Sequence, residues 1–354
     1  MPAAKPTLCV LNYNGAAVLP VALQAACVIR DRFASIVVID NGSQDGSLEL
    51  VGRDFPGVEV LDTGQNLGAA GGRNVGLQRI PADLLLFIDN DVALTANCVD
   101  RLVDSLAARP DAALAVPAVL YADQPDVVQY GGAECHFLGQ QILVNENIPA
   151  DRVDPTTRDM GSLVSCCFLV ERSRLPPGEL FDDSFFIYVE DHEFGVRLRA
   201  LGSTLIAVPA AQCLHGKGTE GLSMRQLGGY SSRRVFYSIR NRWLFLLKIY
   251  TFRTLLVLAP MLVFYEAAQF AVVLKKGWLR EWWNSFTWVI RHLPAVVRER
   301  RRIQRQRVCP DRDLLTGGAL PFRPELTTGA AERLARVVLD RIAVVYWRVA
   351  RRLV

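Results

Sequence analysis

Short apolar runs alternate with helical stretches from the start of the chain to about residue 108. The runs are rich in Val, Ile and Leu and end at polar or glycine-rich residues, which is typical of buried strands. They are residues 8–11, 35–39, 58–61 and 84–88. The stretches with helical spacing are residues 18–27, 46–51, 72–77 and 95–108. This alternation predicts an α/β fold with a mostly parallel sheet, helices on both faces, and a ligand site beyond the carboxyl ends of the strands.

Residues 110–210 are less regular, because proline, aspartate and glycine interrupt the apolar pattern. Strands are expected at residues 113–119, 163–170 and 204–208. A helix is expected over residues 191–200, since Gly202 supplies the glycine that commonly follows a helix C-terminus.

The pattern changes again near residue 230. Residues 255–274 are long and apolar enough to cross a bilayer, with only Pro260, Glu266 and Gln269 against a span. Basic residues flank this stretch on both sides, so the positive-inside rule gives no orientation. Three interpretations stay open, namely a helix that lies in or re-enters the membrane plane, a true span, and a buried helix of a soluble domain.

The net charge of +4 over 354 residues hides an uneven distribution. Residues 1–230 carry 16 Lys and Arg against 28 Asp and Glu, whereas residues 231–354 carry 24 against 8. We therefore expect two domains, 1–230 and 231–354, and expect the second, helical domain to face an anionic surface. Its tryptophans and its basic amphipathic stretch at 332–354 favour a membrane surface over nucleic acid, for which the sequence has no motif.

The eight cysteines are scattered along the chain and lie mostly in apolar runs. They lack the spacing of a zinc site or of a disulfide framework. We therefore expect buried, reduced thiols.

Polar residues mark the ends of the first two predicted strands. Asn12 and Tyr13 follow the first strand, and Asp40 and Asn41 follow the second. A carboxylate at such a strand end can accept hydrogen bonds from a pyrimidine N–H or a ribose hydroxyl. The alternative is that Asp40 is only a turn residue.

A glycine-rich segment, residues 66–76, precedes and opens the third helix and contains Arg73 and Asn74. Glycines before a helix let backbone N–H groups approach a phosphate, and Arg73 would add a cation for a diphosphate. The alternative is close packing of the helix on the sheet through Gly72 and Gly76.

The fourth strand ends at Asp89, Asn90 and Asp91, so two carboxylates lie near the end of a buried strand. Because unpaired buried carboxylates are costly, a cation is expected there, and hard oxygen ligands suit Mg²⁺ or Mn²⁺. His215, after the strand at 204–208, can complete a metal shell. The alternative is a polar turn that begins the next helix.

A second acidic pair, Glu190 and Asp191, opens the helix at 191–200. Acids at a helix N-terminus ordinarily serve as caps. The functional interpretation is that Asp191 faces an acceptor hydroxyl as a general base.

Taken together, these motifs resemble the inverting family 2 glycosyltransferases with the GT-A fold, and most closely bacterial rhamnosyltransferase-type enzymes that build surface polysaccharides. The resemblance covers roughly residues 6–245. The residues that carry it, in order along the chain, are Asp40, Gly71-Gly72-Arg73-Asn74, Asp89-Asn90-Asp91, Glu190-Asp191 with Arg197, and His215.

The resemblance implies a role for each candidate residue. The nucleotide sugar would be bound by Asn12, Tyr13, Asp40, Asn41 and Asn90, and Asp40 would contact the base. The diphosphate would lie at Arg73 and Asn74, and the ribose would lie at Asp89. The metal would be held by Asp89, Asp91 and His215, and the catalytic residue would be Asp191. Cys166, Cys167 and Glu190 would lie on the acceptor side. Two positions depart from the family pattern, since Asn12 replaces a common Thr and Ser165-Cys166-Cys167 replaces a Gly-Ala-type segment, which puts the acceptor in doubt.

The function implied is transfer of rhamnose or a similar sugar from a dTDP- or UDP-sugar, with Mg²⁺ or Mn²⁺ as cofactor. The acceptor would be a glycan or lipid-linked glycan at the cytoplasmic face of the cell membrane. Two alternatives are weighed, a nucleotidyltransferase and a non-catalytic sugar-nucleotide-binding membrane scaffold. The first usually has a glycine-rich phosphate loop directly after the first strand, where this chain has Asn12-Tyr13-Asn14-Gly15; the second does not need a full set of acid, base and metal candidates.

Overall fold

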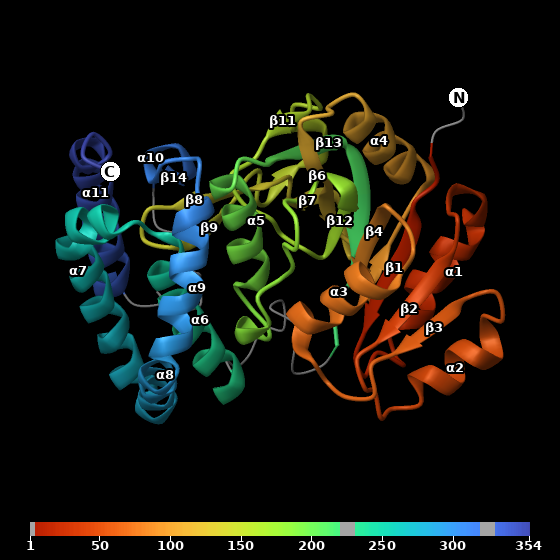
Figure 1. The fold of residues 1–354 in the computed structure, drawn as a ribbon, viewed down its shortest axis with the longest axis horizontal. Helices are drawn as coiled ribbons and strands as arrows, with labels where there is room; N and C mark the ends of the chain where they lie inside the picture. Colours follow the sequence, from red (N-terminus) through yellow and green to blue (C-terminus); the bar gives the residue numbers. More distant parts are fainter. Residues whose placement is uncertain (1–3, 220–230, 319–329) are drawn as a thin grey trace. The chain divides into compact units, whose positions relative to one another are not determined.

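The computed structural model describes residues 4–219, 231–318 and 330–354 (Figure 1). The chain forms two compact units. The first unit comprises Met1–Ala133, Leu143–Leu198 and Ser203–Ser231, and the second comprises Glu134–Ile142, Arg199–Gly202 and Ser232–Val354. The second unit therefore includes two short segments from within the first 230 residues as well as the C-terminal part of the chain.

The first unit is built on an 11-stranded sheet whose main path runs β10-β7-β6-β12-β4-β1-β2-β3. Strands β1, β2, β3 and β4 are parallel, β12 is antiparallel to both β4 and β6, and β13 is parallel to β6. The strands are β1 (Thr7–Asn12), β2 (Ile36–Asp40), β3 (Glu59–Asp62), β4 (Leu84–Asp89), β5 (Val92–Ala93), β6 (Ala112–Tyr121), β7 (Gln124–Tyr130), β10 (Ile148–Pro149), β11 (Arg158–Asp159), β12 (Cys167–Glu171) and β13 (Thr204–His215). The helices are α1 (Leu19–Val28), α2 (Ser47–Asp54), α3 (Gly68–Arg79), α4 (Ala96–Ala107) and α5 (Glu190–Ala200), with short 3-10 turns at Arg30–Arg32, Ala150–Arg152, Arg172–Arg174 and Asp183–Phe185.

Helices cover both faces of this sheet because successive strand residues point to opposite sides. Leu8 and Val10 of β1 pack in one hydrophobic core with residues of α1, α2 and α4. Cys9, between them, packs in a second core with residues of α3 and α5. The predicted α/β class, with a mostly parallel sheet between helices, is therefore confirmed.

Two local predictions are corrected by the structure. β3 is an edge strand and is largely exposed instead of buried, with Val60 43% exposed. The third helix begins at Gly68, so Gly72 and Gly76 lie inside it. A Cβ atom at Gly76 would come within 2.8 Å of Ile39 and Phe87 side-chain atoms, so the glycines allow close packing of α3 on the sheet, as the alternative interpretation expected.

The second unit is mainly helical, with a three-stranded sheet of β14 (Leu315–Thr316), β8 (Ala133–His136) and β9 (Gln140–Leu143). Its helices are α6 (Ser232–Ile249), α7 (Phe252–Lys276), α8 (Leu279–Arg291), α9 (Leu293–Gln306), α10 (Asp311–Leu314) and α11 (Ala330–Ala350). Thr251 caps the start of α7, and Gly277, at φ 73°, ends it. Within the described ranges, α7 is the one helix long and apolar enough to cross a membrane, a criterion that a core helix of a soluble protein can also meet.

Candidate active site

The carboxyl ends of the parallel strands bring the predicted polar residues to one edge of the sheet. In the strand register, Asn12 of β1 is opposite Asp40 of β2, and Leu11 of β1 is opposite Asp89 of β4. This edge is where open α/β sheets bind ligands.

Arg73 is the buried cation of this edge. Its side chain is 3% exposed, and its guanidinium donates to Oδ1 of Asp89 at 2.8 Å. The same guanidinium lies 3.4 Å from Oε1 of Glu190 and donates to the carbonyl oxygen of Ser165 at 3.1 Å. Arg73 therefore joins the acid that ends β4 to the acidic pair that begins α5.

Asp191 is held at the start of α5 by N–H groups. Its Oδ2 accepts from the backbone N–H of Ser165 at 3.1 Å, and its Oδ1 accepts from the N–H of His192 at 2.7 Å. Burial raises the pKa of Asp191, although the charge of Arg73 and these hydrogen bonds act in the opposite direction. Burial and then the charge of Asp191 raise the pKa of Glu190 to about 8. Burial therefore raises the pKa of both neighbouring carboxyls, and such shifts are common at functional sites.

The backbone directly before this acidic pair is strained. Phe186, Tyr188 and Val189 have φ values of 64°, 65° and 69°, in the left-handed region that side chains other than glycine rarely adopt. A β-branched residue such as Val189 is a clear outlier there. Such strain persists only where the surrounding structure enforces it, and it is concentrated at functional sites.

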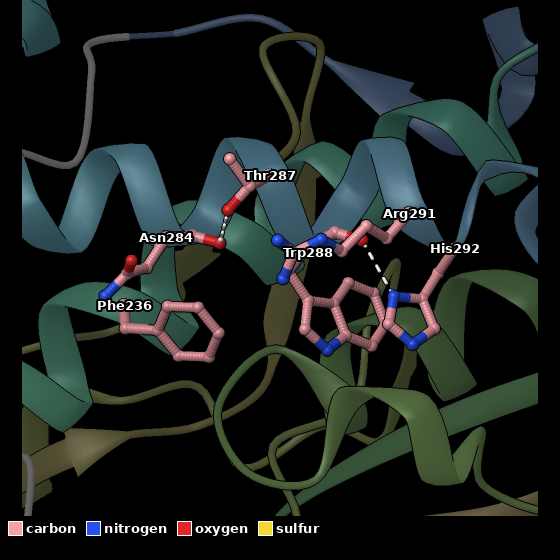
Figure 2. A pocket seen from close by; sticks show the side chains of 6 residues that line it. All are labelled: Phe236, Asn284, Thr287, Trp288, Arg291 and His292. Atoms are coloured by element: carbon pink, nitrogen blue, oxygen red, sulfur yellow. Dashed lines mark hydrogen bonds between the residues drawn. The ribbon is translucent and has the colours of Figure 1, made fainter.

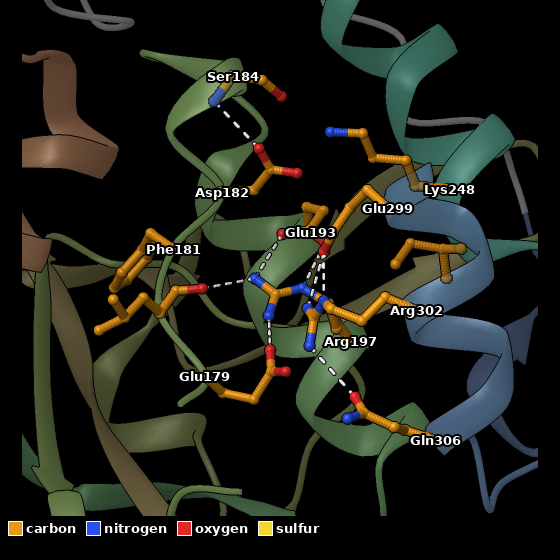
Figure 3. Close-up of polar contacts among 12 residues, drawn as sticks. Glu179, Phe181, Asp182, Ser184, Glu193, Arg197, Lys248, Glu299, Arg302 and Gln306 are labelled. Carbon is orange, nitrogen blue, oxygen red and sulfur yellow. Dashed lines mark hydrogen bonds and ion pairs between the residues drawn. The ribbon is translucent and has the colours of Figure 1, made fainter. Parts of the chain in front are cut away.

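A second buried arginine, Arg197, holds helix α5 in place (Figure 3). Arg197 donates to Glu193 of its own helix at 2.6 Å, to the carbonyl oxygen of Leu180 at 2.8 Å, and to Glu179. Arg197 and Glu193 are almost fully buried. This network ties α5 to the segment that precedes the strained turn.

Asp91 and His215 meet because β5 pairs antiparallel with the end of β13, which places Val92 opposite His215. His215 Nε2 lies 3.4 Å from Asp91 Oδ1. His215 Nδ1 lies 2.8 Å from the amide oxygen of Gln129, which can only accept, so Nδ1 carries the hydrogen and Nε2 keeps a lone pair in the neutral ring. Burial alone would raise the pKa of Asp91, but the hydrogen bond and charge of His215, when its ring is protonated on both nitrogens, lower it overall.

These two side chains fit part of a divalent-metal site. Oδ2 of Asp91 is buried and has no hydrogen-bond partner among the described residues, so it is an acceptor without a donor. No group of three or more possible metal ligands occurs in the described ranges. A carboxylate oxygen and an imidazole nitrogen suit an ion that takes its other ligands from water and substrate phosphates.

Two predicted nucleotide-binding residues lie in a buried network. Asp40 is fully buried, and its Oδ1 accepts from Nδ2 of Asn12 at 2.9 Å and from the hydroxyl of Ser43 at 2.6 Å. Its Oδ2 accepts from the N–H of Ser43 at 2.8 Å. Asn12 Oδ1 in turn accepts from Nδ2 of Asn90. The structure gives Asn12, Asp40 and Asn90 a supporting role, and their direct contact with a nucleotide stays a prediction.

Asn41 and Asn74 also support neighbouring segments. Asn41 donates to the carbonyl oxygen of Gly68 at 2.9 Å and accepts from the N–H of Leu67, so it holds the start of α3. Asn74 donates to the carbonyl oxygen of Phe181 and accepts from the N–H of the same residue, both at 2.8 Å. Asn74 thus anchors the segment that leads toward the strained turn, and a contact with the diphosphate stays a prediction.

A hollow of about 540 Å³ opens beside the loop that follows β1. Tyr13 lies on this loop, is partly exposed, and accepts a hydrogen bond on its carbonyl oxygen from Thr219. The residues that line the hollow are Asn14, Gly15, Ala16, Ala17, Val18, Asp45, Gly218 and Thr219. The exposed lining of this part of the site therefore consists of residues adjacent to the predicted ones.

The expectation that Cys166 and Cys167 line the acceptor side is wrong. Both side chains belong to a hydrophobic core, and Cys167 is fully buried. The thiol of Cys166 lies 2.6 Å from the hydroxyl of Tyr130, and burial raises its pKa far above the ordinary value of a thiol. β12, which begins at Cys167, pairs with β4 and β6 and thereby places this segment in the core. This agrees with the prediction that the thiols of the chain are buried.

Gln129 and Ser165 are the functional residues that the motifs missed. Gln129 lies on β7, within the irregular part of the chain, and no spacing rule connects it to His215. Ser165 belongs to the segment that departs from the family pattern, but its part is played by the backbone N–H, which sequence does not reveal.

Comparison with known proteins finds a family model and a curated relative that match part of the chain. The model of Glycosyl transferase family 2 matches residues 7–170. An N-acetylglucosaminyl-diphospho-decaprenol L-rhamnosyltransferase of Mycobacterium tuberculosis, found in strains CDC 1551 / Oshkosh and ATCC 25618 / H37Rv, is 28% identical over 218 residues, covering 55% of this chain and 70% of the relative.

A solved structure supports the fold. The crystal structure of GalNAc-T7 with UDP, GalNAc and Mn²⁺ superposes with a TM-score of 0.55 at 18% identity, over 69% of this chain and 48% of the other. This chain therefore spans about half the length of that structure, and the likeness concerns the fold alone. With the parallel sheet and its acidic edge, these findings support a family 2 glycosyltransferase domain over residues 7–170, with a GT-A-like fold, in a chain that is similar to a rhamnosyltransferase.

Proposed function

We propose that the chain transfers rhamnose or a similar sugar from a dTDP- or UDP-sugar to a hydroxyl group of a lipid-linked glycan, with inversion at the anomeric carbon, in the synthesis of a cell-surface polysaccharide. The name of the mycobacterial relative supports the sugar and the class of acceptor, a diphospho-polyprenol carrying N-acetylglucosamine. The observation that carries the proposal is the ion-pair bridge of Arg73, which fixes the acid that ends β4 and Glu190, the neighbour of Asp191 on α5, around one buried charge.

Asp191 is the proposed general base. Its carboxylate would accept the proton of the acceptor hydroxyl while that oxygen forms the new bond to the anomeric carbon. The bond between this carbon and the diphosphate oxygen would break on the opposite side, and the nucleoside diphosphate would leave. The raised pKa of Asp191 favours this role, because a base closer in pKa to neutral pH is a better proton acceptor.

Asp91 and His215 would hold a divalent cation, Mg²⁺ or Mn²⁺. When bound, such an ion supplies positive charge that stabilises the diphosphate leaving group. Gln129 orients the His215 ring so that its Nε2 lone pair is available. Arg73 adds a fixed positive charge at the same edge and does so without needing the ion.

The second unit would bind the cytoplasmic face of the cell membrane. Its helix α7 exposes large apolar side chains, among them Phe252 at 70%, Leu256 at 60% and Val263 at 69%. The residues from 231 onward carry 24 Lys and Arg against 8 Asp and Glu. Apolar exposure together with basic charge suits an anionic bilayer, either as a helix in the membrane plane or as a span.

Substitution of Asp191 by Asn tests the catalytic proposal. We expect transfer to fall by roughly 10²–10⁴-fold, the usual contribution of a general base, while a nucleotide-sugar donor still raises the melting temperature of the variant. Asp111→Asn, at an exposed ion pair of the same unit, is the matched control. Full transfer by the Asp191 variant would show that Asp191 is not the general base. Absence of metal-dependent donor turnover in the wild type would favour the alternative of a non-catalytic scaffold.

Membrane binding is tested in the full chain by Leu256→Asp with Val263→Asp. We expect this pair to lose sedimentation with vesicles of phosphatidylcholine and phosphatidylglycerol. The matched pair Val21→Asp with Val28→Asp, on exposed positions of α1, should leave sedimentation unchanged. Equal retention of all three proteins would contradict the proposal.

A further inference from the structure

A hollow of about 390 Å³ lies on helix α8 and the neighbouring helix α6 of the second unit (Figure 2). α6 contributes Phe236, and α8 with the residue that follows it contributes the rest of the lining. The lining residues are Phe236, Asn284, Thr287, Trp288, Arg291 and His292, none of which is acidic.

A stack of side chains supports Trp288, one of the residues that line this hollow, which we call the phosphate hollow. The Trp288 ring stacks on His292, with ring centroids 3.9 Å apart and an angle of 11° between the planes. The guanidinium of Arg240, whose side chain is buried, lies 4.3 Å from the centroid of the same ring. The indole is therefore already stacked against protein groups, which disfavours an aromatic platform for a sugar.

The hollow presents hydrogen-bond donors. His292 Nδ1 lies 2.8 Å from the carbonyl oxygen of Trp288, which can only accept, so Nδ1 donates inward and Nε2 of the neutral ring keeps a lone pair that accepts. The guanidinium of Arg291 and the side-chain amide of Asn284 make no hydrogen bond or ion pair to another residue that the structure describes. The arginine and amide donors of this lining match the oxygens of a phosphate.

An exposed apolar stripe runs along the same helix. Trp283, Phe286 and Ile290 are 56%, 39% and 53% exposed, and Leu279 and Leu293 continue the stripe at its ends. Their spacing places them on one face of α8, next to the face that carries the phosphate hollow. If this stripe enters the acyl region of a bilayer, the donors beside it lie at the depth of the headgroups.

We propose that the phosphate hollow binds the phosphate of an anionic phospholipid headgroup. The inference rests on the proposed contact between the second unit and the membrane, and it adds a specific lipid site to a contact that would otherwise be a general attraction of charges. Arg291 pairs with the phosphate oxygens, the Asn284 amide donates to them, and His292 Nε2 accepts from a hydroxyl of the headgroup glycerol. The Arg240–Trp288–His292 stack holds this arrangement without needing the lipid.

The site is tested with the full chain and vesicles of phosphatidylcholine with or without phosphatidylglycerol. A generic attraction is worth about five-fold in partition for each arginine near the surface, whereas a specific charge-assisted bond adds about ten-fold or more. We therefore expect Arg291→Gln to lose far more binding to anionic vesicles than Arg298→Gln, which removes the same charge from the exposed surface of α9. Equal losses for the two variants would overturn the site.

The source of the phosphate is tested with soluble probes. Dihexanoyl phosphatidylglycerol, which has short acyl chains, should raise the melting temperature of the wild type and of Arg298→Gln but not of Arg291→Gln. Glycerol 3-phosphate should give little or no shift, and a shift equal to that of the short-chain lipid would assign the hollow to a free phosphate ester and overturn the lipid proposal.

Donor turnover in detergent separates this proposal from the proposed function. Arg291→Gln should keep wild-type turnover, and circular dichroism should show an unchanged fold. Loss of turnover in the Asp191 variant but not in the Arg291 variant would show that the two proposals are independent. If the wild type lacks transferase activity but the two arginine variants still differ in lipid binding, the lipid site is supported and only the proposed function is refuted.

Discussion

Replacement of Arg73 by Met removes the central charge of the site while keeping most of the side-chain volume. The guanidinium contacts Asp89 at 2.8 Å and Glu190 at 3.4 Å, and the side chains of Arg73, Glu190 and Asp89 are 3%, 6% and 34% exposed. The variant therefore leaves Asp89 partly exposed to solvent and Glu190 buried, and both carboxyls lose their cationic partner.

The cost of this change follows from burial. Removal of one partner of a buried ion pair typically costs about 3–5 kcal/mol, and the partial exposure of Asp89 places the expected loss near the lower end. We therefore expect a loss of about 3 kcal/mol at alkaline pH, where both carboxyls are ionised in the wild type. For a unit of this size, each kcal/mol lowers the melting temperature by about 2–4 °C, so a shift of about 6–12 °C is expected.

The pH dependence of this loss has a definite sign. Burial raises the folded-state pKa of Asp89 and of Glu190, so each destabilises the fold as pH rises from its unfolded pKa to its folded pKa. Arg73 lowers both folded-state pKa values, and its removal extends that loss to higher pH. The gap between wild type and variant should therefore be smallest in acid and widen with pH, with a final part above about 8, where Glu190 ionises.

Guanidinium chloride denaturation of the full chain, repeated across pH, measures this gap. Arg109→Met is the matched control, because Arg109 also pairs with two acids, Asp111 and Asp159, but is 35% exposed. The control should lose about 0–1 kcal/mol and show no widening gap. A loss below about 1 kcal/mol at every pH for the Arg73 variant, or a gap that narrows toward alkaline pH, would refute the reasoning.

Three further predictions concern neighbouring parts of the site. If ionised Asp191 is the base, the acid limb of kcat/KM against pH should lie above the ordinary range of an aspartate, because burial raises the pKa of Asp191. Gly68→Ala should destabilise the protein more than Gly46→Ala in thermal unfolding, because both glycines have positive φ but only the first would press a Cβ against backbone. His215→Ala should weaken Mn²⁺ binding measured by electron paramagnetic resonance. Unchanged affinity would show that His215 is not a metal ligand.

The sequence predicts the framework because its signals are local. The strand runs at 8–11, 35–39 and 84–88 become β1, β2 and β4, and the positions just after them reach one edge, since parallel strands end together. Their register, with Leu11 opposite Asp89, follows from the apolar alternation that fills two cores.

The individual contacts depend on long-range pairing that sequence spacing does not encode. Asp191 is oriented by the backbone N–H of Ser165, and His215 by Gln129, across 26 and 86 positions of the chain. The inward orientation of Cys167 depends on the antiparallel insertion of β12 between β4 and β6, which the alternation of strands and helices does not predict.

The first turn of α5 holds three carboxyls, of which Asp191 is the proposed base. Glu190, Asp191 and Glu193 all lie at the N-terminal end of the helix, where the dipole favours negative charge. Glu190 is paired with Arg73 and Glu193 with Arg197, whereas Asp191 forms no ion pair to any residue in the described part of the chain. Two arginines therefore hold the flanking acids in fixed places, the strained turn before them sets the start of the helix, and the charge of Asp191 is left available for a proton. If this selection is correct, exchanging the paired acid Glu193 for Gln should lower stability with little change in the pH limb of kcat/KM, whereas Asp191→Asn should remove that limb and leave stability largely intact.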